Sequence, residues 1–144
     1  MPRPIVNRAT TVWNGDLVSS GSGKTTFETS GLGTFDVNWK ARAEESGAVT
    51  TPEELIAAAH ATCFSMQFAH MLSESGHVAT SLKASAEVIF VAGEGITGIR
   101  LTVEGDVPGI EREEFLKTAE SAKEACPVSQ ALKAVDITLE ASLV

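Results

Sequence analysis

The sequence predicts an α+β fold with the element order β-β-β-α-β-β-α-β. Three short runs rich in β-branched and aromatic residues come first, and a long stretch without glycine or proline follows them. Two longer runs of alternating polar and apolar residues, a second helical stretch and a final alternating run complete the chain. Since 144 residues suffice for one domain with a buried core, we expect a single domain over residues 1–144.

The N-terminal third predicts an antiparallel meander. Turns that contain glycine separate its three runs, and such turns commonly join neighbouring antiparallel strands. The predicted strands are Ala9–Trp13, Thr25–Ser30 and Thr34–Lys40.

A long helix is predicted from Glu53 to about Ser75. Thr51 suits the N-cap, Pro52 the first helical position, and Glu54 completes a capping box. The helix is apolar on nearly every face over its first two thirds, and about 22 residues give it a length of roughly 33 Å. Such a helix needs more cover than one small sheet provides, which favours dimerisation.

The second half predicts a long hairpin, a helix and a closing strand. Alternation of apolar and polar residues indicates the strands, and the proline after Cys126 breaks the helix. The predicted elements are the strands Leu82–Ala92 and Gly95–Val107, the helix Glu111–Ala125, a short helical turn at Val128–Lys133 and the strand Val135–Leu143.

Composition and charge argue against several classes of protein. The formal net charge is -8 at pH 7, whereas nucleic acid and anionic membranes attract a basic face. The first 14 residues lack the apolar segment of a secretory signal, and no apolar run approaches the roughly 18 residues that span a bilayer. We therefore expect a cytoplasmic protein that binds neither nucleic acid nor membrane, in a compartment that keeps thiols reduced.

The two cysteines are the candidates for chemistry. Cys63 lies in the middle of the apolar helix, and Cys126 lies at the end of the second helix. A thiol is nucleophilic only as the thiolate, which burial opposes and a nearby cation favours. A reactive Cys63 therefore needs a cation. Arg42, close before the helix, is the best candidate, and Arg3 and Arg8 are weaker ones.

Glu53 is the candidate carboxylate that would hold this arginine. Ten residues of helix, about 15 Å, separate Glu53 from Cys63, so the two cannot share a site within one straight helix. They can meet if two such helices pack antiparallel in a dimer. Alternatively, Glu53 only interacts with the helix dipole in the first turn.

Three segments have a specific pattern: TPEEL at 51–55, AAHATCFSM at 58–66 and ACPVSQ at 125–130. They resemble the osmotically inducible protein C / organic hydroperoxide resistance (OsmC/Ohr) family, and the similarity in element order covers essentially the whole chain. The residues that precede Cys63, together with Arg42, favour the OsmC-like branch. The resemblance implies an intertwined homodimer, with antiparallel sheets wrapped around two central helices and two sites at the subunit interface.

The resemblance also implies a peroxidase that reduces organic hydroperoxides. The family's peroxidatic cysteine corresponds to Cys63, its resolving cysteine to Cys126, its helix-start glutamate to Glu53 and its arginine to Arg42. The implied cycle runs through a sulfenic acid and a Cys63–Cys126 disulfide, which an external dithiol of the lipoyl type reduces. No metal and no bound cofactor are implied.

Three other interpretations stay open. His60, Cys63 and His70 lie on one face of the helix and could belong to a metal site. His60 could act as the base for Cys63 in a cysteine hydrolase. In a non-catalytic dimeric binding module, the cysteines would only be small buried side chains. Three apolar side chains of the helix either line a substrate pocket or belong to the core: Phe64, Met66 and Phe68.

Overall fold

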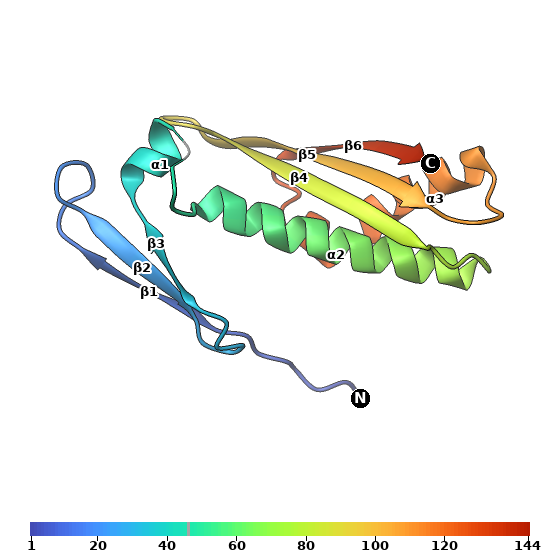
Figure 1. Ribbon diagram of the computed structural model, residues 1–144, viewed down its shortest axis with the longest axis horizontal. Helices are drawn as coiled ribbons and strands as arrows, with labels where there is room; N and C mark the ends of the chain where they lie inside the picture. Colours follow the sequence, from blue (N-terminus) through green and yellow to red (C-terminus); the bar gives the residue numbers. More distant parts are fainter. Residues whose placement is uncertain (46) are drawn as a thin grey trace. The chain divides into compact units, whose positions relative to one another are not determined.

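The structure, a computed structural model, describes residues 1–45 and 47–144. The chain forms two compact units, an N-terminal unit (Met1–Pro52) and a C-terminal unit (Glu53–Val144). Each unit contains one three-stranded sheet (Figure 1). Strands and helices are mixed as the sequence predicts, so the α+β class is confirmed.

The N-terminal unit is an antiparallel meander followed by a short helix. Its elements are β1 (Ala9–Asn14), β2 (Ser22–Phe27), β3 (Thr34–Val37) and α1 (Trp39–Ala43). Three strands are present as predicted, with β1 and β3 on either side of β2. The second spans Ser22–Phe27 and not Thr25–Ser30, because the chain turns after Phe27, whose carbonyl accepts a hydrogen bond of 2.9 Å from the Gly31 N–H. The third strand ends at Val37 and not at Lys40. The reason is that Asn38 Oδ1 accepts a hydrogen bond of 2.8 Å from the Ala41 N–H and caps α1, which the sequence analysis missed.

The N-terminal sheet buries little apolar surface. All six residues of β1 are exposed. Hydroxyl pairs across neighbouring strands provide side-chain contacts, with 2.8 Å between the Oγ1 atoms of Thr11 and Thr25 and 2.9 Å between those of Thr26 and Thr34. Strand pairing therefore contributes more to this unit than a hydrophobic core does.

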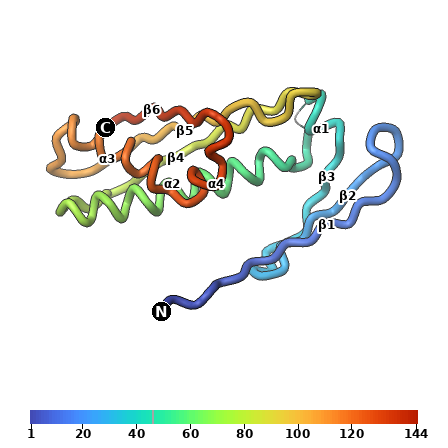
Figure 2. The backbone as a smooth tube through the Cα atoms, turned by 180° about the vertical axis from the view of Figure 1, so that it is seen from behind, coloured from blue at the N-terminus to red at the C-terminus, as the bar shows by residue number. Residues whose placement is uncertain are grey.

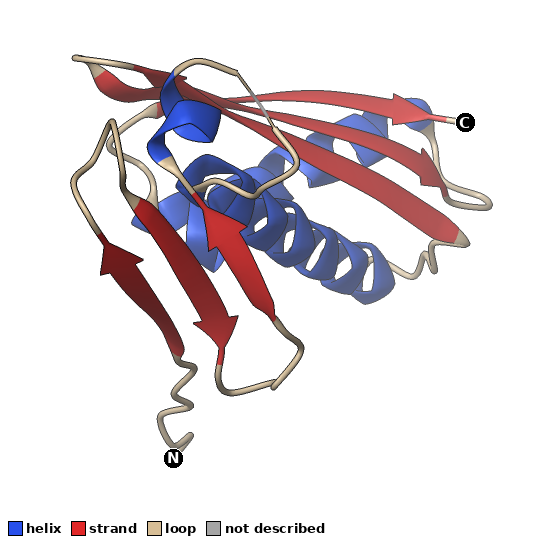
Figure 3. Cartoon of the chain, turned by 60° about the vertical axis from the view of Figure 1, so that its left-hand side comes forward, coloured by secondary structure: helices blue, strands red, loops and turns tan. Residues whose placement is uncertain are grey.

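The C-terminal unit packs helices on one face of its sheet. Its elements are α2 (Pro52–Glu74), β4 (Ser81–Val91), β5 (Gly95–Asp106), α3 (Arg112–Ala125), α4 (Pro127–Ala131) and β6 (Asp136–Leu143). The strand order is β4-β5-β6. Figure 3 shows the long helices below the strands of this sheet, and Figure 2 shows α4 beside the middle of α2.

One pairing in this sheet differs from the prediction. β4 and β5 form the predicted antiparallel hairpin, but β6 pairs with β5 in parallel. The expectation of wholly antiparallel sheets is wrong at this strand because α3 and α4 form the connection between β5 and β6. This helical connection brings the chain back to the end of the sheet at which β5 begins. β6 therefore runs in the same direction as β5.

A dense core fills the space between this sheet and its helices. Phe115 of α3 packs against Phe68 of α2 in a tilted arrangement, with 5.2 Å between ring centroids. It also lies over Gly105 of β5, where a Cβ atom would come within 2.5 Å of the ring. The absence of a side chain at this position therefore allows α3 to approach the sheet. The buried core residues are Phe64, Phe68, Leu72, Leu101, Val103, Val107, Ile110, Phe115, Ala119, Ala122 and Cys126.

Helix α2 is long and apolar enough, by length and composition, to cross a membrane. The expectation that no segment approaches this length is therefore wrong, because alanines and scattered polar residues conceal the high mean hydropathy of the helix. Phe64, Phe68 and Leu72 are fully buried in the core of the unit. Of the apolar window of this helix, 22% is buried within the described structure.

Candidate active site

The candidate site contains both cysteines of the chain and lies at the middle of α2. Cys63 is partly buried on this helix, whereas Cys126 is fully buried where α3 and α4 meet. Both cysteines are free, and the Cys126 side chain lies near enough to Cys63 to raise the pKa of its thiol. The structure thus brings together two residues that are 63 positions apart in the sequence.

The Cys126–Pro127 pair explains how the second thiol reaches α2. A residue before proline avoids the helical region, and Cys126 accordingly has extended dihedral angles, φ -60° and ψ 121°. Its N–H donates to the carbonyl of Ala122 at 2.9 Å, and its own carbonyl accepts from the Gln130 N–H at 3.0 Å. Cys126 therefore ends α3 and begins α4 at the same corner, and this corner faces α2.

The surroundings of Cys63 within its unit favour the neutral thiol. Burial raises the pKa of Cys63, the hydrogen bond and charge of Cys126 raise it further, and a hydrogen bond from the Val128 N–H lowers it. The net direction is upward. None of the described groups that shift the pKa of Cys63 is a cation. A reactive thiolate at this position therefore needs positive charge from outside these groups.

A second contact between α2 and α4 lies one helical turn from the cysteines. His60 Nε2 and Ser129 Oγ are 2.7 Å apart, and both side chains are buried. Burial also lowers the pKa of His60, which favours the neutral imidazole. The sequence analysis gave no role to Val128 or Ser129. The matched spacing of three residues, from His60 to Cys63 and from Cys126 to Ser129, was the signal that could have found this contact.

The other predicted site residues lie apart from the thiol pair or in the other unit. Glu53 is 7% exposed in the first turn of α2, and α2 is continuous to Cys63, so about 15 Å of helix separates them. Arg42 is half-buried in α1 of the N-terminal unit, and Arg3 and Arg8 are exposed before β1. The roles of Arg42 and Glu53 stay predictions.

The alternative roles considered for α2 have less support. In residues 1–45 and 47–144, no group of three or more His, Cys, Asp or Glu could hold a metal ion. The His60 ring is hydrogen-bonded to Ser129 and not to Cys63, which does not favour a base for a hydrolase. Phe64 and Phe68 belong to the core, and Met66 is 69% exposed, so these three side chains do not form the apolar pocket considered above.

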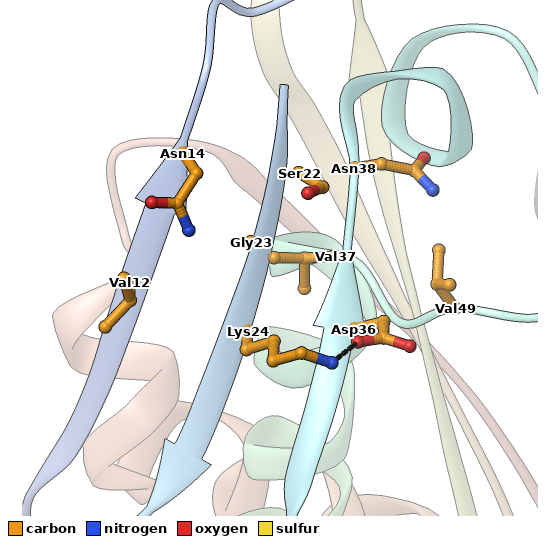
Figure 4. Close-up of a pocket in the computed structure, with 9 residues that line it drawn as sticks. All are labelled: Val12, Asn14, Ser22, Gly23, Lys24, Asp36, Val37, Asn38 and Val49. Carbon is orange, nitrogen blue, oxygen red and sulfur yellow. Dashed lines mark hydrogen bonds and ion pairs between the residues drawn. The ribbon is translucent and has the colours of Figure 1, made fainter. Parts of the chain in front are cut away.

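The N-terminal unit has a surface hollow of about 390 Å³. Val12, Val37 and Val49 line part of it, and Lys24 forms an ion pair of 2.6 Å with Asp36 at its edge (Figure 4). None of the predicted catalytic residues lines this hollow. It therefore contributes nothing to the thiol site as described.

Comparison with known proteins assigns the chain to a family. The family described as OsmC-like protein matches residues 44–140, a span that includes Glu53, Cys63 and Cys126 but not Arg42. The chain belongs to this OsmC-like family. Peroxiredoxin OsmC of Escherichia coli (strain K12) is 44% identical to it over 135 residues, which cover 91% of this chain and 92% of the relative. The protein is accordingly a peroxidase, and a purely non-catalytic binding module is set aside.

Solved structures agree with the OsmC-like fold. The organic hydroperoxide resistance protein OhrB of Bacillus subtilis is 25% identical, with a TM-score of 0.68 over 94% of this chain and 98% of that chain. An OsmC from Legionella pneumophila is 24% identical, with a TM-score of 0.71 over 98% of this chain and 99% of that chain. The second match concerns the fold alone.

Proposed function

We propose that this OsmC-family peroxidase reduces organic hydroperoxides to alcohols, with Cys63 as the nucleophile and Cys126 as the resolving residue. The observation that carries the proposal is that the Cys126 side chain lies beside Cys63 at the middle of α2, near enough to raise the pKa of its thiol. The substrate class is supported by the name of the Bacillus subtilis neighbour, an organic hydroperoxide resistance protein.

The chemistry has three steps. The Cys63 thiolate attacks one peroxide oxygen, the O–O bond breaks, and the other oxygen leaves as the alcohol after it takes up a proton. Cys63 is then a sulfenic acid, and the Cys126 thiol displaces its hydroxyl group as water to form the disulfide. An external dithiol, for which we propose the lipoyl type, reduces this disulfide and becomes a disulfide itself.

The burial of the two sulfur atoms suggests where the reductant attacks. Cys126 is fully buried, whereas Cys63 is partly exposed. Thiol–disulfide exchange depends on access to the attacked sulfur. The external dithiol is therefore expected to form its mixed disulfide with Cys63 and to release Cys126 as the leaving thiol.

Arg42, oriented by Glu53, would supply the positive charge that none of the described groups acting on the pKa of Cys63 provides. Burial and Cys126 raise the pKa of this thiol, so a cation is needed to favour the thiolate. We assign this role to Arg42, oriented by Glu53. Because about 15 Å of helix separates Glu53 from Cys63, we also propose a homodimer in which antiparallel α2 helices bring the start of one helix to the middle of the other. A dimer would also make one functional domain of residues 1–144 by covering the N-terminal sheet.

The expected environment of the enzyme is the cytoplasm, without nucleic acid or membrane as a partner. The net charge of -8 supports the absence of nucleic acid and anionic lipid partners. A redox-active dithiol of this kind also needs a compartment that keeps its reductant reduced.

The first test is peroxide consumption with dihydrolipoamide as reductant, comparing an alkyl hydroperoxide with hydrogen peroxide. We expect turnover that prefers the alkyl substrate and disappears in Cys63→Ser. The Cys126→Ser variant should react once with peroxide but accumulate the sulfenic acid or its over-oxidised products. Full turnover in Cys63→Ser, or turnover unchanged in Cys126→Ser, would contradict the proposal.

The arginine assignment has matched controls in the same unit. Arg42→Ala should lower the rate of Cys63 alkylation at neutral pH at least tenfold, on the order expected for a lost thiolate-stabilising charge, whereas Arg8→Ala should leave it unchanged. An equal loss in Arg8→Ala, or no loss in Arg42→Ala, would move the role to another cation.

A further inference from the structure

The contact between His60 and Ser129 is outside the chemistry described so far. Both side chains are buried, at 0% and 5% exposed, and 2.7 Å separates His60 Nε2 from Ser129 Oγ. They lie one turn from the thiols on the same two elements, since His60 precedes Cys63 by three residues and Ser129 follows Cys126 by three. The two cysteines and the two polar side chains therefore form neighbouring contacts between α2 and the segment Cys126–Ala131.

The two contacts respond differently to the reaction. While Cys63 is reduced, the neighbouring Cys126 thiol raises its pKa and the Val128 N–H lowers it. Oxidation to the sulfenic acid changes this sulfur and hence its interactions with both neighbours. The bond between His60 and Ser129 involves no redox-active atom, so it persists while Cys126 must reach the sulfenic sulfur.

The protonation of His60 is consistent with a fixed structural contact. Its Nδ1 atom is buried and has no hydrogen-bond partner in the described part of the chain. A buried N–H without an acceptor costs more free energy than a buried lone pair without a donor, so we assign the proton to Nε2, which then donates to Ser129 Oγ. In this state the imidazole holds Ser129 and is not available to take a proton through Nε2.

We propose that His60 is a positioning residue that, through Ser129, holds α4 against α2 and keeps Cys126 within reach of oxidised Cys63. The inference rests on the proposed function, because it assigns the pair to the resolving step. Without this contact the Cys126 thiol should meet the sulfenic acid less often, and excess peroxide should convert more of Cys63 to sulfinic acid.

The test separates the resolving step from the peroxide step. Reduced protein is mixed with an alkyl hydroperoxide, and quenched samples are analysed by intact mass for sulfenic acid, disulfide and sulfinic acid. In Ser129→Ala we expect disulfide formation to slow by about 10- to 100-fold, as for other small misplacements of reacting groups, while the rate of peroxide consumption in the first turnover changes less than about twofold. The yield of sulfinic acid should rise in proportion.

Two further variants keep the result interpretable. The double variant His60→Phe/Ser129→Ala removes both polar partners, so no buried group is left unpaired, and it should still resolve slowly although its thermal unfolding temperature recovers relative to Ser129→Ala. The matched control is Ser65→Ala, which removes another α2 hydroxyl, one that donates to the Ala61 carbonyl at 2.8 Å within the helix. This control should resolve at the wild-type rate.

Each outcome bears on one hypothesis. If the wild type forms the Cys63–Cys126 disulfide and Ser129→Ala forms it at the same rate, the positioning role is wrong and the proposed function stands. A loss of the peroxide step equal to that of the resolving step would indicate general damage to the site and would also overturn the inference. If the wild type forms no such disulfide, the proposed function fails and takes the inference with it.

Discussion

The two sheets of this protein have three strands each but differ in how they are covered. In the C-terminal unit, Leu101 and Val103 of β5 are 1% and 0% exposed, because α2 and α3 pack their aromatic rings over the sheet. In the N-terminal unit every residue of β1 is exposed, and Val12 is 59% exposed. A three-stranded sheet is stable by itself only if it has a hydrophobic face or packs against a helix. The difference teaches that the C-terminal unit can sustain its own core, whereas the N-terminal sheet needs another surface.

The largest expected effect concerns the core of the C-terminal unit. Phe115→Ala should lower the free energy of unfolding by about 3–5 kcal/mol, because the ring is fully buried between α2 and the sheet. Urea denaturation followed by circular dichroism measures this loss. Leu32→Ala, at a position that is 79% exposed in the N-terminal unit, is the control and should change stability by less than about 0.5 kcal/mol. Equal losses in the two variants would contradict the contrast between the units.

A second prediction tests whether a partner chain covers the N-terminal sheet. Val12→Asp places a charge on an exposed apolar position of β1 and should weaken dimer association at least tenfold, since burying an unpaired charge is costly. Analytical ultracentrifugation over a range of concentrations measures the dissociation constant. Thr102→Asp adds the same charge to the exposed face of β5 and should not change it. A dimer that is unaffected by Val12→Asp would remove β1 from the interface.

A smaller effect is expected from the titration of His60. Burial lowers its pKa, so the folded protein keeps the imidazole neutral at pH values where the unfolded chain already binds a proton. This contribution to stability is present above the ordinary pKa of about 6.5 and is lost as the pH falls toward the lowered value. Urea unfolding at pH 7.5 and pH 5.5 should therefore show a smaller decrease in His60→Phe than in the wild type. The same decrease in both proteins would assign the acid sensitivity to other groups.

The smallest effect is expected at the ion pair beside the N-terminal hollow. Lys24 Nζ and Asp36 Oδ1 are 2.6 Å apart, but their side chains are 69% and 62% exposed. Exposed pairs of this kind contribute little, so Lys24→Ala should change the free energy of unfolding by less than about 1 kcal/mol in 150 mM salt. A larger loss would mean that a partner chain buries the pair, and would strengthen the case for a covered N-terminal sheet.

Local signals in the sequence were sufficient for most elements. The Pro52 start of α2, the alternation along β4 and β5 and the break at Cys126–Pro127 depend on a few neighbouring residues, and all three appear in the structure. The sequence analysis missed α1 because its signal is a single Asn38 cap on a five-residue helix. It did not anticipate that β6 would run parallel to β5, because strand direction depends on the path of α3 and α4 over the sheet.

By itself, the sequence determined the fold class, the two candidate cysteines and the family resemblance, because residue type, periodicity and spacing are local properties of the chain. Only the tertiary structure decided that the side chains of Cys63 and Cys126 lie beside each other, and that His60 binds Ser129 one turn away. Residues more than 60 positions apart meet only when packing fixes the path of α3 and α4 against α2. The environment that raises the pKa of Cys63 and lowers that of His60 also arises from this packing, since it depends on burial and not on sequence neighbours.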